Sequence, residues 1–151
     1  MSSSTIVKVV IVLVAVLAVL YILSNPDEIA ALFDDRPDVR FFDGPSISES
    51  SIPVNFKSII SVTVRNYDSK DVSNIEARLS VVKGGSWQEH LEFTPVTKLA
   101  SSLSPGETTD KVNIPIQAKK LSGIETPFIL KLEIYADGKS VAKHTFDIKI
   151  K

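Results

Sequence analysis

The chain of 151 residues has room for one domain of moderate size, and it contains no cysteine. Without cysteine there can be no disulfide, no thiolate metal site and no thiol catalysis. A net charge of −1 gives no electrostatic reason to expect nucleic acid as a partner. The charge is unevenly distributed, because Lys8 is the single charged side chain in the first 23 residues. The sequence therefore divides into an apolar start and a charged remainder.

An apolar run of 18 residues extends from Ile6 to Leu23, interrupted by Lys8 and by the amphipathic Tyr21. A helix over this run would be roughly 27 Å long, close to the thickness of the hydrocarbon layer. Lys8 can extend its amine to one interface, and Tyr21 suits the other. We predict a transmembrane anchor over residues 1–24, with the lipid bilayer as its partner. The alternative is a cleaved signal peptide, which the long run and the lack of an Ala-x-Ala site disfavour.

The flanking charges predict the orientation of this anchor. The N-terminal side has the α-amine and Lys8 and no acid. The other flank has Arg36 and Arg40 against five acids, namely Asp27, Glu28, Asp34, Asp35 and Asp38. The positive-inside tendency then places the N-terminus in the cytoplasm and the C-terminal domain outside the cell membrane. Residues 25–38 are predicted to form a juxtamembrane linker. A short helix is expected at residues 26–35, as a spacer, a continuation of the anchor or a docking helix.

Residues 39–151 show short β-rich runs separated by turn residues, which is the pattern of an all-β domain. Strands are expected at residues 39–42, 56–66, 75–82, 87–93, 96–103, 109–117, 128–135 and 140–150. Residues 46–51 are expected to be a polar joint. Pro115 is expected at an edge or a bulge. Asp137-Gly138 predicts a tight hairpin turn. We therefore predict an immunoglobulin- or fibronectin-III-like antiparallel sandwich of about seven strands over residues 39–151.

Three segments resemble the CARDB and NEW3-like domains, namely residues 61–67, 72–75 and 103–108. They reproduce a strand that ends in Asn66, a following strand, and a later Leu-x-Pro-Gly-Glu turn at residues 103–107. The resemblance covers residues 54–150 and implies a sandwich of the kind found on bacterial and archaeal surface proteins, used for binding or spacing. The layout of one anchor and one sandwich is also similar to that of the archaellum accessory proteins F and G. A likeness to the WHy domain is opposed by Tyr67, which stands where proline is expected.

No pattern indicates catalysis, a cofactor or a metal site. His90 and His144 each stand alone in an expected strand, so they are expected to be structural or surface residues. A Gly-x-Ser-x-Gly elbow is absent, and Gly84-Gly85 fits a turn better than a phosphate loop. We predict a protein without enzymatic activity or a small-molecule substrate.

Three aromatic residues are candidates for contact with a partner. Trp87 is either an exposed hot spot or packs over one end of the sandwich. Phe41 and Phe42 are adjacent in an expected strand, so their side chains point to opposite faces. One of them is expected in the core, and the other at the membrane, the linker or a partner.

These observations predict a single-pass envelope protein of a prokaryote, an archaeon in our interpretation. Its sandwich would bind another envelope component through edge strands or loops. The alternative is a small accessory subunit of a larger membrane complex, in which the helix packs against other subunits and the sandwich caps the extracytoplasmic side. A stress-related domain of the WHy type is a third hypothesis.

Overall fold

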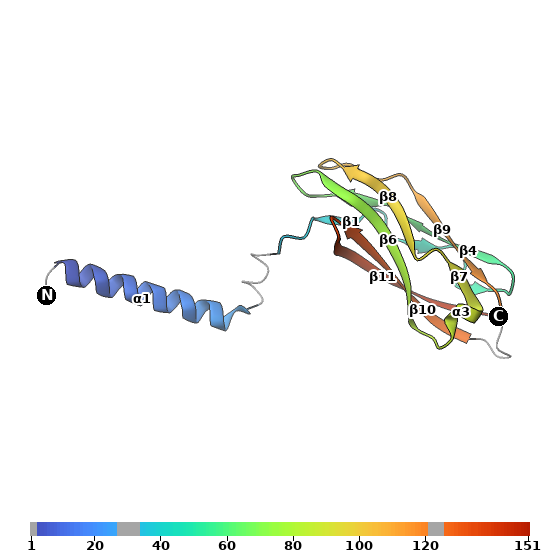
Figure 1. The fold of residues 1–151 in the computed structure, drawn as a ribbon, viewed down its shortest axis with the longest axis horizontal. Helices are drawn as coiled ribbons and strands as arrows, with labels where there is room; N and C mark the ends of the chain where they lie inside the picture. The colour runs from blue at the N-terminus through green and yellow to red at the C-terminus, as the bar shows by residue number, and fades with distance from the viewer. Residues whose placement is uncertain (1–2, 27–33, 121–125) are drawn as a thin grey trace. The chain divides into compact units, whose positions relative to one another are not determined.

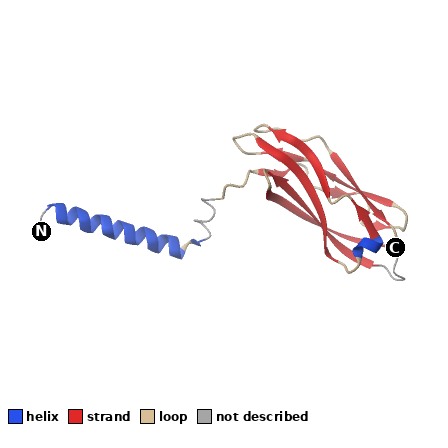
Figure 2. Ribbon diagram, viewed as in Figure 1, coloured by secondary structure: helices blue, strands red, loops and turns tan. Residues whose placement is uncertain are grey.

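The structure is a computed structural model that describes residues 3–26, 34–120 and 126–151 (Figure 1). The chain forms two compact units, Met1–Asp35 and Arg36–Lys151, which are described here one at a time. The first contains the apolar helix α1, and the second is built almost entirely of strands (Figure 2).

Helix α1 spans Ser3–Ser24, and the part long and apolar enough to cross a membrane is Ser4–Ser24. All of the described side chains in this stretch are exposed, as expected of a helix that is surrounded by lipid. The Ser24 hydroxyl and the Asn25 amide donate to the carbonyls of Leu20 and Tyr21, so both residues complete the end of α1. Of the short helix predicted at residues 26–35, Pro26 is helical and residues 34–35 are not, and the rest lies outside the described residues.

The second unit is a sandwich of two sheets. One sheet has the strand order β3 (Ser51–Ile52), β11 (Lys139–Ile150), β10 (Thr126–Ala136), β6 (Val72–Lys83) and β8 (Val96–Leu103). The other has the order β2 (Ser46–Ile47), β4 (Lys57–Val62), β9 (Val112–Ala118) and β7 (Leu91–Phe93). A separate pair joins β1 (Val39–Phe41) to β5 (Val64–Asn66). The pairing is antiparallel except between β3 and β11. This arrangement confirms the predicted immunoglobulin-like sandwich.

Alternating residues of the long strands build the core. On β10 the inward side chains are Phe128, Leu130, Leu132 and Ile134, and each is at most 1% exposed. Ile60, Val62, Ile114 and Ile116 face them from the second sheet and are equally buried. These are the faces that the period-two alternation predicts, because one side of each strand packs on the opposite sheet.

The strand predicted at residues 56–66 is divided at Thr63. The Thr63 carbonyl accepts a hydrogen bond from the Phe42 amide (2.9 Å), and the Thr109 hydroxyl accepts one from the Val64 amide (3.1 Å). Thus β4 pairs with β2 before this point, and β5 pairs with β1 after it.

The prediction of a polar joint at residues 46–51 is wrong in part, because this segment contains strand β2 and the first residue of strand β3. Serine hydroxyls here bind backbone groups at the edge of the sheet, as when Ser48 accepts from the Ile59 amide at 2.9 Å. The joint thus belongs to both sheets, and it leads into the fully buried Ile52. Its serine content hid this role in the sequence.

The first half of the strand predicted at residues 87–93 is also wrong, because Trp87–His90 is a helical turn, α3. Ser86 has φ of 50°, and its carbonyl accepts a hydrogen bond from the Glu89 amide (3.1 Å), which closes the turn. The Trp87 ring then stacks on Phe93, with 4.9 Å between the ring centroids. Strands β7 and β8 follow, separated only by residues 94 and 95, where the chain changes from one sheet to the other.

The predicted hairpin and the predicted effect of Pro115 are both confirmed. Ala136 pairs with Lys139, and the two residues between them, Asp137 and Gly138, have φ of 51° and 76°, as a type I′ turn requires. Strand β7 ends at Phe93, opposite Ile116, so Pro115 is the first residue of β9 beyond the end of β7. The missing N–H of proline therefore falls where β9 is locally an edge.

Candidate protein-interaction surface

Four side chains cluster on and just beyond the β1–β5 pair, and they are called here the aromatic–arginine surface: the exposed Arg40, Phe42 and Tyr67, and the half-buried Arg65. The β1–β5 register places Arg40 directly opposite Arg65. Val64 and Asn66 are buried, so alternation directs Arg65 and Tyr67 to the outer side. The exposed fractions of Phe42 and Tyr67 are 44% and 46%, which is high for large aromatic side chains.

Both guanidinium groups contact aromatic rings. The Arg65 Cζ lies 5.7 Å from the ring centroid of Phe42 and 5.4 Å from that of Tyr67. The Arg40 Cζ lies 5.2 Å from the same Tyr67 ring. These distances are within the range of cation–π attraction, which holds two like charges near one ring. The result is a surface in which aromatic faces and N–H donors lie side by side.

The two arginines differ in their charge partners. Arg40 forms two hydrogen bonds of 2.7 Å with the Asp38 carboxylate, which raise the pKa of the guanidinium above its usual value. Among the described residues, no carboxylate pairs with Arg65, and its buried Nε has no hydrogen-bond partner. A buried, unpartnered donor on a charged group is uncommon and needs a physical explanation.

The underlying backbone fixes Arg65 in place. The Asn66 amide donates to the Glu107 carbonyl (3.0 Å), and the Gly106 amide donates to the Asn66 carbonyl (2.8 Å). A Cβ on Gly106 would lie 3.7 Å from the Arg65 Nη2, so the guanidinium lies beside this turn. The segments of the CARDB-like motif, around Asn66 and at residues 103–107, therefore meet beneath the aromatic–arginine surface.

The structure places the three predicted contact residues differently. Phe42 belongs to the surface, whereas Phe41 is half-buried, with its ring 6.4 Å from that of His144. Trp87 is half-buried and packs against the core. A partner contact by any of the three stays a prediction. Sequence reasoning missed Arg40, Arg65 and Tyr67 as contact residues. Alternation did place Arg65 on an outer face, but nothing local in the sequence indicates that β1 pairs with β5.

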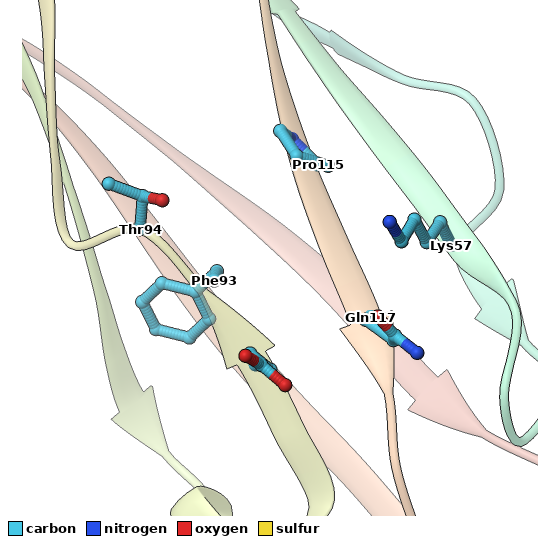
Figure 3. A pocket seen from close by; sticks show the side chains of 6 residues that line it. Lys57, Phe93, Thr94, Pro115 and Gln117 are labelled. Atoms are coloured by element: carbon cyan, nitrogen blue, oxygen red, sulfur yellow. The ribbon is translucent and has the colours of Figure 1, made fainter.

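A small hollow of about 210 Å³ lies where β7 leaves β9. Figure 3 shows Phe93 and Thr94 on one side of it and Lys57 on the other, with Pro115 and Gln117 between them. Ligand pockets usually measure about 300–1,000 Å³, so this hollow is small for a substrate.

The residues that could bind a metal ion are not grouped together. Within the described ranges, no three His, Asp or Glu side chains lie close enough to one another to hold a metal ion. The buried His90 instead places Nδ1 2.8 Å from the Lys120 carbonyl.

Comparisons with known proteins support the fold. No family model matches the chain, and no curated protein matches it. The CARDB domain of a Pyrococcus furiosus protein, solved by NMR, aligns with a TM-score of 0.51 and 16% identity, over 76% of this chain and 95% of the domain. A crystal structure of that domain in complex with di-metal ions aligns with a TM-score of 0.46 and 15% identity, over 74% of this chain and 93% of the domain. The predicted CARDB-like sandwich is thus confirmed as a fold.

The alkylpurine DNA glycosylase AlkC of Pseudomonas fluorescens, bound to DNA with an abasic site analog, aligns with a TM-score of 0.47 and 15% identity. The alignment covers 76% of this chain but only 31% of the glycosylase. At such identities the likeness concerns the fold alone.

Proposed function

We propose that this protein is a non-enzymatic, membrane-anchored binding module, whose extracytoplasmic sandwich contacts another envelope protein through the aromatic–arginine surface. Residues 1–24 serve as a single-pass anchor with a cytoplasmic N-terminus, residues 25–38 as the linker, and residues 39–151 as the binding domain. The observation that carries the proposal is the Arg65 guanidinium, which contacts two exposed rings and has no carboxylate partner among the described residues.

The composition of this surface is that of a binding hot spot. Tyrosine and arginine are enriched among the few residues that supply most of the binding free energy, because they combine apolar area with directional hydrogen bonds. The rings of Phe42 and Tyr67 would lose water on contact, and the Arg65 donors would gain a partner. The exposed apolar α1 supports the anchor, since its candidate span Ser4–Ser24, 21 residues long, suits a bilayer.

Co-purification from the native envelope tests the surface. Tagged full-length protein and the Phe42→Ala/Tyr67→Ala double variant are cross-linked in cells, extracted in mild detergent and analysed by mass spectrometry. We expect one or more envelope proteins with the parent chain and a loss of about tenfold or more with the double variant. Phe56→Ala is the matched control, because Phe56 is 64% exposed and lies outside this surface. Equal recovery by all three proteins would contradict the proposal.

Protease accessibility tests the orientation. With the domain outside, protease added to intact cells removes a C-terminal tag, while an N-terminal tag survives until the membrane is opened. The reverse pattern would place the sandwich in the cytoplasm and remove the envelope partner from the proposal.

An accessory subunit of a larger membrane complex is the second candidate. It is supported by α1, whose described side chains are all exposed and therefore available to other helices. Exchange of α1 for an unrelated apolar helix distinguishes the two. Partners that are lost on this exchange but kept by the Phe42→Ala/Tyr67→Ala variant would favour the subunit role.

A further inference from the structure

Two arginines of the sandwich, Arg40 and Arg78, each contact a tyrosine ring and also bind a carboxylate. The Arg78 Cζ lies 3.8 Å from the Tyr135 ring centroid, and its Nε donates to Glu76 at 2.7 Å. Arg40 lies over Tyr67, and its Nε donates to Asp38, also at 2.7 Å. In both cases the carboxylate comes from the residue two positions earlier, which lies on the same side of an extended chain. The ring covers the guanidinium, and the acid neutralises it.

Arg65 has the rings but lacks the carboxylate. The residue two positions before it is Thr63, which has no charge. The neighbouring acids bind other groups: Glu107 accepts from the Ser104 amide (2.7 Å), and Asp68 accepts from the Ser69 amide (2.7 Å) and the Asp38 amide (3.3 Å). Arg65 is therefore a ring-covered, half-buried guanidinium to which its own strand supplies no carboxylate.

We propose that a single glutamate or aspartate carboxylate from a segment of the partner protein binds Arg65 beside the Phe42 and Tyr67 rings. The inference rests on the proposed function, since it names the chemistry of the partner at the same surface. Guanidinium groups bind carboxylates with paired, directional hydrogen bonds, and the flanking rings limit competition by water.

Among anions, a single carboxylate is the one that the charges around Arg65 oppose least. Asp38 offsets Arg40, so Arg65 is the guanidinium of this surface that no carboxylate of the described residues pairs with. Asp43 and Asp68 lie close by in the sequence of the same strands and turns, so a phosphate dianion or an anionic bilayer would meet repulsion that one carboxylate largely avoids. These acids therefore favour one carboxylate from a protein segment over a lipid phosphate in an anionic bilayer.

Side-chain NMR on the full chain in detergent micelles tests the inference directly. The protein has four arginines, at positions 36, 40, 65 and 78, so ¹⁵N-arginine labelling gives four Nε–Hε signals. The probe is the acetylated and amidated peptide Gly-Glu-Gly, and its control is Gly-Gln-Gly. We expect the Arg65 signal to shift with the glutamate peptide alone, while Arg78, already bound by Glu76, stays in place. An Arg65 signal that moves with neither peptide would overturn the inference.

A substitution at Thr63 supplies a second, independent measurement. Thr63→Glu places an acid where Glu76 stands relative to Arg78, so it should occupy Arg65 and weaken peptide binding roughly ten- to hundredfold. Thr63→Gln has the same size without the charge and should bind the peptide as the parent does. Equal weakening by both variants would mean that bulk, not charge, governs the site, and would overturn the inference.

Two further outcomes separate this inference from the proposed function. If the Arg65 signal moves in nanodiscs of anionic lipid but not with the glutamate peptide, a lipid phosphate is the ligand and the inference is wrong. If the peptide leaves the Arg65 Nε–Hε signal unchanged while the Phe42→Ala/Tyr67→Ala variant still loses its envelope partner, the inference is wrong and the proposed function stands.

Discussion

The side-chain amide of Asn66 donates a hydrogen bond to the carbonyl of Leu103, 2.9 Å away and 37 residues later in the chain. The same nitrogen donates to the Lys70 carbonyl (2.8 Å), and the amide oxygen accepts from the Asp68 backbone (2.8 Å). Asn66 is fully buried, so these bonds satisfy groups that water does not reach. One side chain thereby joins the end of β5 to the end of β8, an edge strand of the five-stranded sheet.

Asn66→Ala should lower the free energy of unfolding by about 2–4 kcal/mol, because it leaves buried backbone groups without partners. The measurement is urea unfolding of residues 36–151, followed by the fluorescence of Trp87, the single tryptophan. Asn113→Ala is the control, since Asn113 accepts one exposed hydrogen bond from Ser61 and should cost about 0.5 kcal/mol or less. Similar losses in the two variants would contradict the structural role given to Asn66.

Gly84 is predicted to tolerate no side chain. It has φ of 132°, and a Cβ there would lie 2.3 Å from the Cδ1 of the buried Phe128. Gly84→Ala should therefore cost about 2–4 kcal/mol, from backbone strain and displacement of a core ring. Gly85→Ala, where a Cβ would meet no atom within 4 Å, should change stability by less than about 0.5 kcal/mol. Urea unfolding distinguishes them, and an unchanged midpoint for Gly84→Ala would contradict the packing described.

The sequence predicts those parts of the fold that depend on local alternation. The inward faces of β4, β6 and β10 follow from period-two patterning, and the β10–β11 hairpin follows from Asp137-Gly138. The sequence-based predictions are wrong where side-chain contacts and strand pairing override the alternation. At the turn α3 the Trp87 ring stacks on Phe93, a contact that alternation along a strand does not predict. The serine-rich residues 46–51 join both sheets through contacts with distant strands.

The candidate surface shows the same limit. Phe42 could be singled out as an aromatic residue beside another in a short strand. Arg65 could only be placed on an outer face, because its neighbours Arg40 and Tyr67 come together through the β1–β5 register. The cluster depends on pairing between segments about 25 residues apart, and alternation within one strand carries no information on that pairing.

Asp137 is predicted to stabilise the hairpin through both its backbone and its side chain. It adopts φ of 51°, and its Oδ1 accepts from the Ser73 amide at 3.0 Å, which ties the turn to β6. Asp137→Ala loses this bond and places alanine in a left-handed conformation, at a cost of about 1–3 kcal/mol. Asp137→Asn keeps an acceptor and tolerates the conformation, so it should lie within about 0.5 kcal/mol of the parent. Thermal unfolding in which asparagine and alanine behave alike would contradict this account.

Glu133 is predicted to make stability depend on pH. The hydrogen bond from Lys131 is the main cause that holds its pKa below the usual value of 4.5, and burial partly opposes it. Because the folded pKa is the lower one, the carboxylate stabilises the fold above pH 4.5, and this contribution is lost as pH falls through the folded pKa. Thermal unfolding across this acid range should therefore show Glu133→Gln and the parent converging at low pH and diverging towards neutrality. Lys131→Met should reduce that divergence, since it removes the donor, whereas parallel profiles at all pH values would show that the pair does not contribute to acid sensitivity.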